Sequence, residues 1–80
     1  MKEKKIKLAT IDDAKIFVSK AMNCNFDIDV SYDRVVVDAK SILGVLSLNL
    51  TRNLTVRMYG ENEAFEKYLD TLQAPGEKIA

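Results

Sequence analysis

The sequence predicts an α+β fold in which a four-stranded antiparallel sheet carries three helices on one face. Four segments alternate between apolar and polar residues, which is typical of strands that have one face in solvent. Three other segments carry apolar residues at helical spacing, so the predicted order is βαββαβα. The 80 residues are enough for one domain, residues 1–80, and residues 73–80 are expected to form a flexible tail.

The first strand and the first helix are predicted near the N-terminus. In the segment KIKLAT, residues 5–10, Ile6 and Leu8 fall on one side of the strand. The next helix begins after Thr10, whose hydroxyl can accept a hydrogen bond from a first-turn N–H. Asp13 lies three residues further on, close to the pattern of a capping box. The apolar face of this helix is predicted to consist of Ile11, Ala14, Phe17, Val18, Ala21 and Met22.

The middle of the sequence predicts an antiparallel hairpin. The segment FDIDVSY, residues 26–32, alternates strictly and is the clearest strand in the chain. Asp33 and Arg34 form a tight turn, and VVVD, residues 35–38, returns as a short strand. Arg34 lacks the freedom of glycine at positive φ, so the sequence leaves the turn type open.

A second helix, a last strand and a last helix complete the predicted fold. Ser41 is expected to cap the helix ILGVLSL, residues 42–48, which Gly44 weakens. A glycine there indicates that another segment or a partner comes close. LTVRMY, residues 54–59, alternates as a strand, and ENEAFEKYLDTL, residues 61–72, follows as a helix. The apolar face of the last helix is predicted to consist of Phe65, Tyr68, Leu69 and Leu72.

The composition excludes several classes of function. Twelve basic residues balance twelve acidic ones, which argues against nucleic acid as a partner. No apolar run reaches the length of a membrane span, and Cys24 is the single cysteine, so we expect a cytoplasmic protein with a buried, structural thiol. The sequence has no histidine, which excludes imidazole metal sites, Ser-His catalysis and phosphohistidine chemistry. No enzymatic activity, metal site or cofactor is expected.

One stretch resembles a known family. KSILGVLSL, residues 40–48, is similar to the signature around the regulatory serine of the HPr family, and DIDVSYDRVVVDAKS runs into it at the family's spacing. These proteins are the small phosphocarriers of the bacterial sugar phosphotransferase system. The likeness extends to about Leu72. It implies the HPr-like open-faced β-sandwich, the same fold that the alternating segments predict.

The second signature of the family is altered here. HPr proteins have a histidine that caps the first helix, followed by alanine, arginine and proline, and the matching segment of this chain is TIDDA. The resemblance therefore places Thr10 where the phosphorylated histidine would be, Asp12 in place of the arginine and Asp13 in place of the proline. A phosphothreonine is a stable ester, and no general base lies near Thr10 in the sequence. The two carboxylates would oppose an incoming phosphate by roughly 1 kcal/mol or more each.

Thr10 is accordingly interpreted as a plain helix cap, and the chain as having no catalytic residue. Two alternatives stay open. One is that Thr10 relays a phosphoryl group, and the other is that Asp12 or Asp13 forms an acyl-phosphate, which would need a Mg²⁺ site that is not apparent in the sequence.

Ser41 carries two compatible interpretations. It is a helix cap, and the resemblance implies that it is also a regulatory phosphorylation site in bacteria that have HPr kinase. A phosphate at a helix N-terminus interacts favourably with the helix dipole, so the helix would survive the modification. The family uses outward residues of this helix for partner binding, which makes Ile42, Leu43 and Leu46 the candidate contacts. The alternative is that all the apolar residues of this helix are core.

These observations predict a regulatory, protein-binding module similar to catabolite-repression HPr, which lacks the active histidine and keeps the serine. The implied partners are proteins of the HPr type, namely a kinase, a transcriptional regulator or phosphotransferase components. Nucleic acid and membrane insertion are not expected, and the chain is expected to be a monomer or a weak homodimer. One alternative is a phosphocarrier with an unconventional acceptor. Another is a structural or oligomeric role in which the second helix forms the contact.

Overall fold

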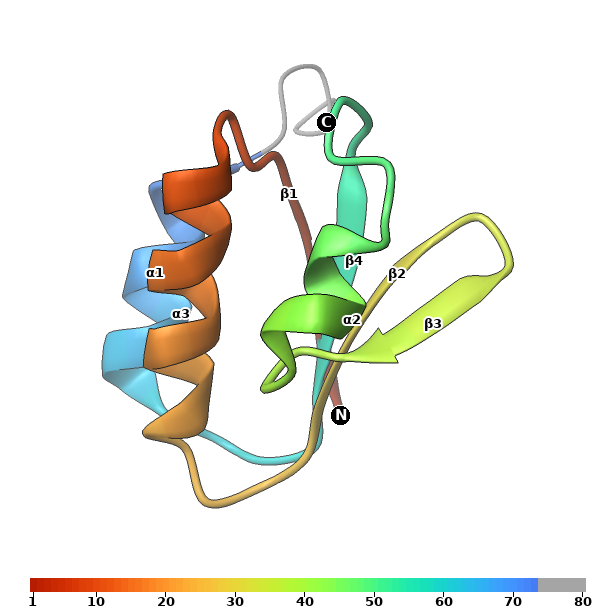
Figure 1. Ribbon diagram of the computed structural model, residues 1–80. Coiled ribbons are helices and arrows are strands. Elements are labelled where there is room, and N and C mark those ends of the chain that lie inside the picture. Colours follow the sequence, from red (N-terminus) through yellow and green to blue (C-terminus); the bar gives the residue numbers. More distant parts are fainter. Residues whose placement is uncertain (74–80) are drawn as a thin grey trace, which may run out of the picture.

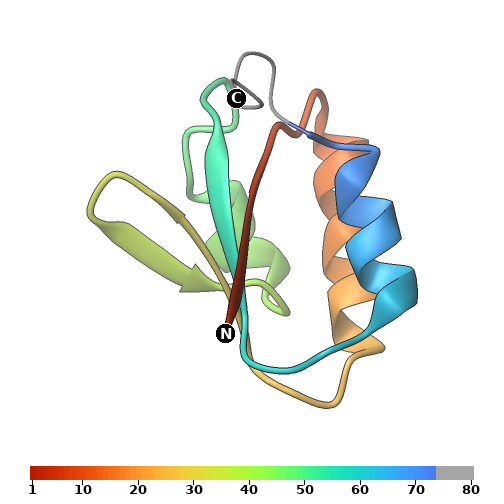
Figure 2. The same cartoon turned by 180° about the vertical axis from the view of Figure 1, so that it is seen from behind.

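The computed structural model describes residues 1–73 and contains the predicted elements in the predicted order. The strands are β1 (Lys2–Ile6), β2 (Ile28–Tyr32), β3 (Val35–Asp38) and β4 (Leu54–Met58). The helices are α1 (Ile11–Met22), α2 (Ile42–Leu46) and α3 (Glu63–Asp70). All strand pairs are antiparallel in the order β1-β4-β2-β3, and the helices cover one face of the sheet (Figure 1 and Figure 2). The predicted α+β fold is confirmed.

The core lies between the sheet and the helices. Helices α1 and α3 lie side by side over one part of the sheet, and α2 lies over the part nearer β3 (Figure 1). The centre of the core is Phe17, which is fully buried and whose ring centroid lies 6.1 Å from that of Phe65. In β4 the alternation is as predicted, since Leu54, Val56 and Met58 are completely buried.

Two residues of the predicted apolar face of α1 are exposed. Ile11 and Met22 retain 59% and 63% of their accessible surface, so their assignment to the core is wrong. Both lie at the ends of α1 and at the margin of the stripe formed by Ala14, Phe17 and Ala21, which are completely buried. Residues at the margin of a helical stripe turn away from the sheet, and at the helix ends little lies over them.

Several boundaries differ from the predicted ones. β1 begins at Lys2 and ends at Ile6, so Leu8 is buried outside the strand. α2 ends at Leu46, because the chain turns at the C-cap, Ser47. Gln73 forms an antiparallel bridge with Ile6, so the predicted flexible tail does not start there. Residues 74–80, the rest of that predicted tail, lie outside the described residues.

Two backbone positions shape the β2–β3 hairpin and its contact with α2, namely Asp33 in the turn and Gly44 in the helix. Asp33 adopts the left-handed region at φ 57°, so the aspartate and not Arg34 takes the positive φ of the turn. Asp is among the few non-glycine residues that tolerate this region. Gly44 faces β3, where an added Cβ would lie 3.3 Å from Cβ of Val37. The glycine of α2 therefore permits the close approach of another segment, as its presence in a helix indicated.

Among residues 1–73, none of the helices has the length and apolar character needed to cross a membrane.

Tyr68 gives the fold a pH dependence at high pH. Burial raises the pKa of Tyr68 to about 12, and the negative charge of Asp13 acts in the same direction. Between pH ~10 and about 12, Tyr68 therefore keeps its hydroxyl proton in the folded state and loses it in the unfolded chain, where its pKa is about 10. We expect this contribution to stability to be complete below pH ~10 and to disappear as the pH rises to about 12. Urea titrations of wild type and Tyr68→Phe across this range test it. Parallel losses of stability in both proteins would contradict the prediction.

Candidate functional site

The N-terminus of α1 has the geometry of a closed helix cap. Thr10 is extended, and its Oγ1 accepts the backbone N–H of Asp13 at 3.1 Å. The side chain of Asp13 reaches back and accepts the backbone N–H of Ala9 through Oδ2, also at 3.1 Å. This arrangement resembles the capping box that the sequence suggested. It differs in that the carboxylate of Asp13 accepts the N–H of Ala9, whereas in a capping box it would accept the N–H of the cap residue, Thr10. Asp12 is exposed on the first turn.

This arrangement is unfavourable for an incoming phosphate. A phosphate at a helix start needs free N–H donors and positive charge. Here the N–H groups of Ala9 and Asp13 already donate to side chains of the cap, and Asp12 and Asp13 add negative charge. Within residues 1–73 no lysine or arginine forms an ion pair with either carboxylate. The N-terminus of α1 thus has the structure of a stable cap and lacks the charge of an anion site.

The N-terminus of α2 is capped by Ser41 as predicted. Its backbone is extended, and its Oγ accepts the backbone N–H of Gly44 at 3.2 Å. The carbonyl of Ser41 accepts the N–H of Val45, which begins the helical hydrogen bonding. Ser41 is half-buried, so its hydroxyl combines a structural bond with partial access to solvent.

Lys40 fixes the approach to α2. Its ammonium donates to the carbonyl oxygen of Cys24 at 2.8 Å, which joins the end of α1 to the start of α2. Its backbone N–H donates to the side chain of Asp38, and the N–H of Ser41 donates to the carbonyl of the same residue. Ser41 therefore lies in a tightly bonded corner between β3 and α2.

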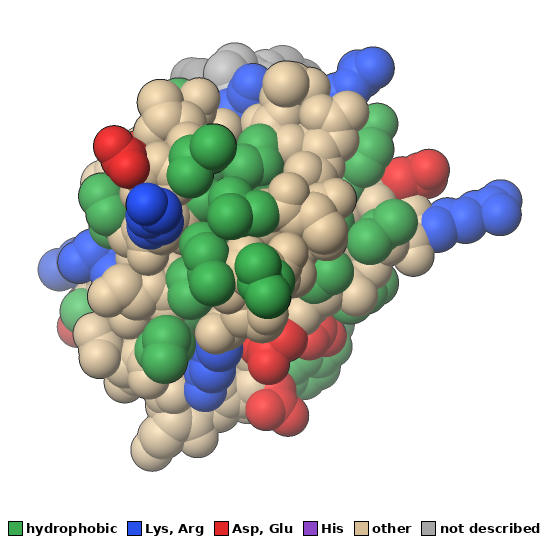
Figure 3. All heavy atoms as spheres, viewed as in Figure 1, with side chains coloured by type: hydrophobic (Ala, Val, Ile, Leu, Met, Phe, Trp, Pro, Cys, Tyr) green, Lys and Arg blue, Asp and Glu red, His purple; other side chains and the backbone are tan. Residues whose placement is uncertain are grey.

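The apolar residues of α2 divide between the core and the surface. Val45 is completely buried and Ile42 is half-buried against the core. Leu43 retains 79% of its surface and Leu46 retains 36%, so the alternative that the whole helix is core is wrong. Hydrophobic side chains gather over α2 in the space-filling view, with acidic side chains at the lower edge of this area (Figure 3). An exposed apolar patch of this kind is typical of an interaction surface.

The patch extends onto α1, which the sequence analysis missed. Lys15, Val18, Ser19 and Met22 line a shallow apolar hollow together with Ile42 of α2. Met22 is exposed beside this hollow. Positions 15, 18 and 22 do recur along one side of a helix, but only the packing of α1 against α2 turns this side into a hollow, so spacing alone does not predict it. Met22, Ile42, Leu43 and Leu46 make up the α1/α2 patch.

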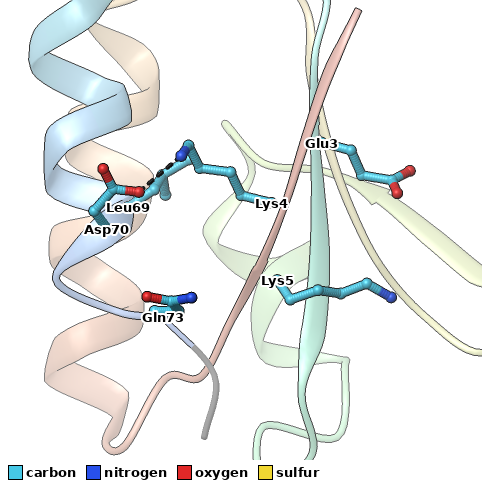
Figure 4. A pocket seen from close by; sticks show the side chains of 6 residues that line it. All are labelled: Glu3, Lys4, Lys5, Leu69, Asp70 and Gln73. Atoms are coloured by element: carbon cyan, nitrogen blue, oxygen red, sulfur yellow. Dashed lines mark hydrogen bonds and ion pairs between the residues drawn. The ribbon is translucent and has the colours of Figure 1, made fainter. Parts of the chain in front are cut away.

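The other candidate features carry no chemistry of their own. Cys24 is buried, as predicted, and burial raises the pKa of its thiol. A charged hollow of about 220 Å³ lies between β1 and α3, and neither Thr10 nor Ser41 lines it (Figure 4). In the part of the chain that the structure describes, no group of three or more Cys, Asp or Glu side chains is placed to hold a metal ion.

Comparisons with known proteins agree on one family. A family model described as "PTS HPr component phosphorylation site" matches residues 11–76. The crystal structure of HPr-C-His from Thermoanaerobacter tengcongensis is similar with a TM-score of 0.75 and 29% identity, covering 89% of both chains. The phosphocarrier protein HPr from Bacillus anthracis is similar with a TM-score of 0.71 and 26% identity, covering 90% of this chain and 96% of that one. The match of the family model begins one residue after Thr10.

Proposed function

The chain belongs to the HPr family, and from this premise we propose that it is a regulatory, protein-binding member that carries no phosphate on histidine. The observation that carries the proposal is the α1/α2 patch, an exposed apolar surface that adjoins the capping serine of α2. The sequence contains no histidine. At the cap formed by Thr10 and Asp13, no cation among the described residues is available to a phosphate, and the N–H groups of Ala9 and Asp13 already donate to the cap side chains. Binding and not transfer is the activity these residues support.

The proposed partners are proteins of the HPr type: a kinase, a transcriptional regulator or phosphotransferase components. Such partners would bury Leu43 and Leu46, which are the most protruding apolar side chains of α2. An apolar contact at the centre with charged residues around it matches the usual anatomy of a transient protein interface. A cytoplasmic location is part of the same proposal, because these partners act there.

Ser41 is the proposed control point of this surface. Phosphorylation would add nearly two negative charges at the edge of the patch. The phosphate oxygens would remain close to the N–H of Gly44, which the hydroxyl oxygen now accepts at 3.2 Å. The helix should therefore persist after modification, and the change should be in which partner the surface accepts.

Substitutions on the patch test the binding proposal. We expect Leu43→Lys and Leu46→Lys each to weaken binding of purified HPr kinase or enzyme I at least about tenfold, since a lysine would bury its charge in an apolar contact. Isothermal titration calorimetry on the purified proteins measures this. Ser41→Asp is expected to change the relative affinity for the two partners, because it places one negative charge beside the patch.

Ile16→Lys is the matched control. Ile16 is another exposed apolar residue of α1, with 48% of its surface accessible, and it does not line the hollow beside α2. The same change of chemistry at this position should leave both affinities unchanged. If Leu43→Lys and Leu46→Lys bind both partners as tightly as wild type, the α1/α2 patch is not the interface.

A second candidate function is a phosphocarrier with an unconventional acceptor. Membership of the HPr family favours it, and the family model that matches is described by its phosphorylation site. The acceptor would be the hydroxyl of Thr10 or a carboxylate of Asp12 or Asp13. The closed cap argues against it, because phosphate would have to displace two internal hydrogen bonds at a site with no paired cation.

A further inference from the structure

The two edges of the sheet differ sharply in chemistry. At the β1 edge charged side chains alternate across the strand: Lys4 points to Asp70 of α3, and Glu3 and Lys5 point to the other side (Figure 4). The bridge between Ile6 and Gln73 also covers the end of this edge. Lysines and covering segments are the devices by which proteins prevent edge strands from pairing with other chains. The β1 edge is protected in this way.

The β3 edge carries no lysine between Val35 and Asp38. Among the described residues, only its C-terminal end is engaged, because the carbonyl of Asp38 accepts the N–H of Ser41 and its carboxylate accepts the N–H of Lys40. The central residues of β3 are three valines, and Val35 and Val36 retain 51% and 53% of their surface. The β2–β3 hairpin extends away from the helices, and β3 forms its outer side (Figure 1). An exposed apolar edge without lysine or proline presents its unpaired N–H and C=O groups to another strand.

The backbone N–H and C=O of Val36 lie in the plane of the sheet and point toward its open edge. Tyr32 and Val35 flank the two-residue turn and form its hydrogen-bonded pair, so hydrogen-bonded pairs recur at every second position along the hairpin. The N–H of Ala39 donates to the carbonyl of Ile28 at 2.9 Å, which continues the same alternation. Val36, opposite Ser31, belongs to the other set, and its N–H and C=O are directed to the outer edge.

The sequence of this edge is complementary to itself. In an antiparallel pair of two β3 strands centred on Val36, each Val36 lies opposite its copy and each Val35 lies opposite Val37 of the second copy. The same register brings Arg34, the turn residue directly before β3, opposite Asp38 of the second copy. Opposite charges that face each other across strands stabilise a pair, and valines opposite valines do the same. Any other register of this kind separates the charges from each other.

A second copy would also compensate a repulsion within the monomer. Asp29 and Asp38 are directly opposite in the β2–β3 ladder, where like charges are destabilising. Arg57 lies beside Asp29, but its guanidinium donates to Glu3 at 2.8 Å. Within residues 1–73 no ion pair involves Asp38 or Arg34. Arg34 of a second copy would bring a cation to Asp38.

We infer that the chain forms a homodimer through antiparallel pairing of the two β3 edges, centred on Val36, which joins the two sheets into one. The inference is independent of the proposed function, since β3 contributes none of the residues of the α1/α2 patch. The paired segment, residues 34–38, is only five residues long, and small interfaces bind weakly. The dimer should therefore form at protein concentrations of about 1 mM and dissociate at lower concentrations.

Charge reversal tests the register directly. Arg34→Asp and Asp38→Arg should each be monomeric by sedimentation equilibrium at concentrations where wild type associates, because each places like charges opposite each other. An equimolar mixture of the two variants should associate again. In the mixed pair the introduced aspartate faces the introduced arginine, and the native Arg34 of one variant faces the native Asp38 of the other. Thermal denaturation confirms that each variant is folded. Val36→Lys, which changes neither charged position, should also be monomeric.

Arg52→Asp is the matched control, with the same change of net charge as Arg34→Asp at an exposed loop position far from β3 in sequence. It should associate as wild type does. A wild-type chain that stays monomeric at about 1 mM overturns the inference. So does association that survives Val36→Lys or both charge reversals and disappears in Leu43→Lys, because the contact would then be α2.

Discussion

Replacing Phe17 with alanine is expected to lower the free energy of unfolding by about 3–5 kcal/mol, the usual range for a buried phenylalanine. Phe17 is completely buried on α1 and its ring lies beside that of Phe65 on α3, with the centroids 6.1 Å apart. Its removal would leave a cavity where α1 and α3 meet the sheet. In a domain of this size such a loss is a large part of the total stability. Urea denaturation followed by circular dichroism measures it.

Ile16→Ala is the control for this prediction. Ile16 is the neighbour of Phe17 on the same helix, but 48% of its surface is accessible. The substitution should change stability by about 0.5 kcal/mol or less, since alanine favours the helix and little buried surface is lost. Equal losses for Phe17→Ala and Ile16→Ala would mean that the face of α1 that packs on the sheet has been assigned wrongly.

The second large effect is a gain of function. The double variant Thr10→His/Asp12→Arg is expected to accept a phosphoryl group from enzyme I, whereas we expect wild type to accept none. The imidazole supplies the nitrogen, and the guanidinium replaces a repulsive charge beside it with an attractive one. The cost is the cap bond from the Asp13 N–H, about 1 kcal/mol. Acid-labile label from phosphoenolpyruvate, with enzyme I present, measures the gain.

Two comparisons make that experiment specific. Thr10→His alone should be labelled more slowly than the double variant, because the carboxylate of Asp12 still opposes the phosphate. The phosphocarrier HPr from Bacillus anthracis, similar in fold, serves as the positive control. If the double variant is folded and remains unlabelled while that protein is labelled, a histidine and an arginine at these two positions are not sufficient for acceptor chemistry.

The sequence was sufficient for the fold because each strand alternates and each helix has its own cap. Thr10 and Ser41 both cap as predicted, since a hydroxyl before an apolar helical pattern has few other local partners. The exposure of Ile11 and Met22 was not predictable from spacing. Both fit the apolar period of α1, and only the placement of the helix on the sheet decides which margin of the stripe is covered.

The candidate site was predictable in part for a similar reason. Helical spacing required that the apolar residues of α2 divide, and Leu43 and Leu46 are on the exposed side as expected, with Ile42 between core and surface. Met22 joined the patch only through the packing of α1 against α2, a long-range contact that no local pattern contains. The left-handed Asp33 agrees with the residue preference for this region, which favours aspartate over arginine, although the turn type was left open.

The most direct test of a phosphocarrier fold without carrier chemistry is incubation of the untagged wild-type chain with enzyme I and phosphoenolpyruvate labelled in its phosphoryl group, followed by peptide mapping. The tag must be absent because the chain itself has no histidine. We expect no label on the first turn of α1 and no transfer to an acceptor, while Bacillus anthracis HPr is labelled in parallel. Label on Thr10, Asp12 or Asp13 that passes onward would contradict this and establish an unconventional phosphocarrier.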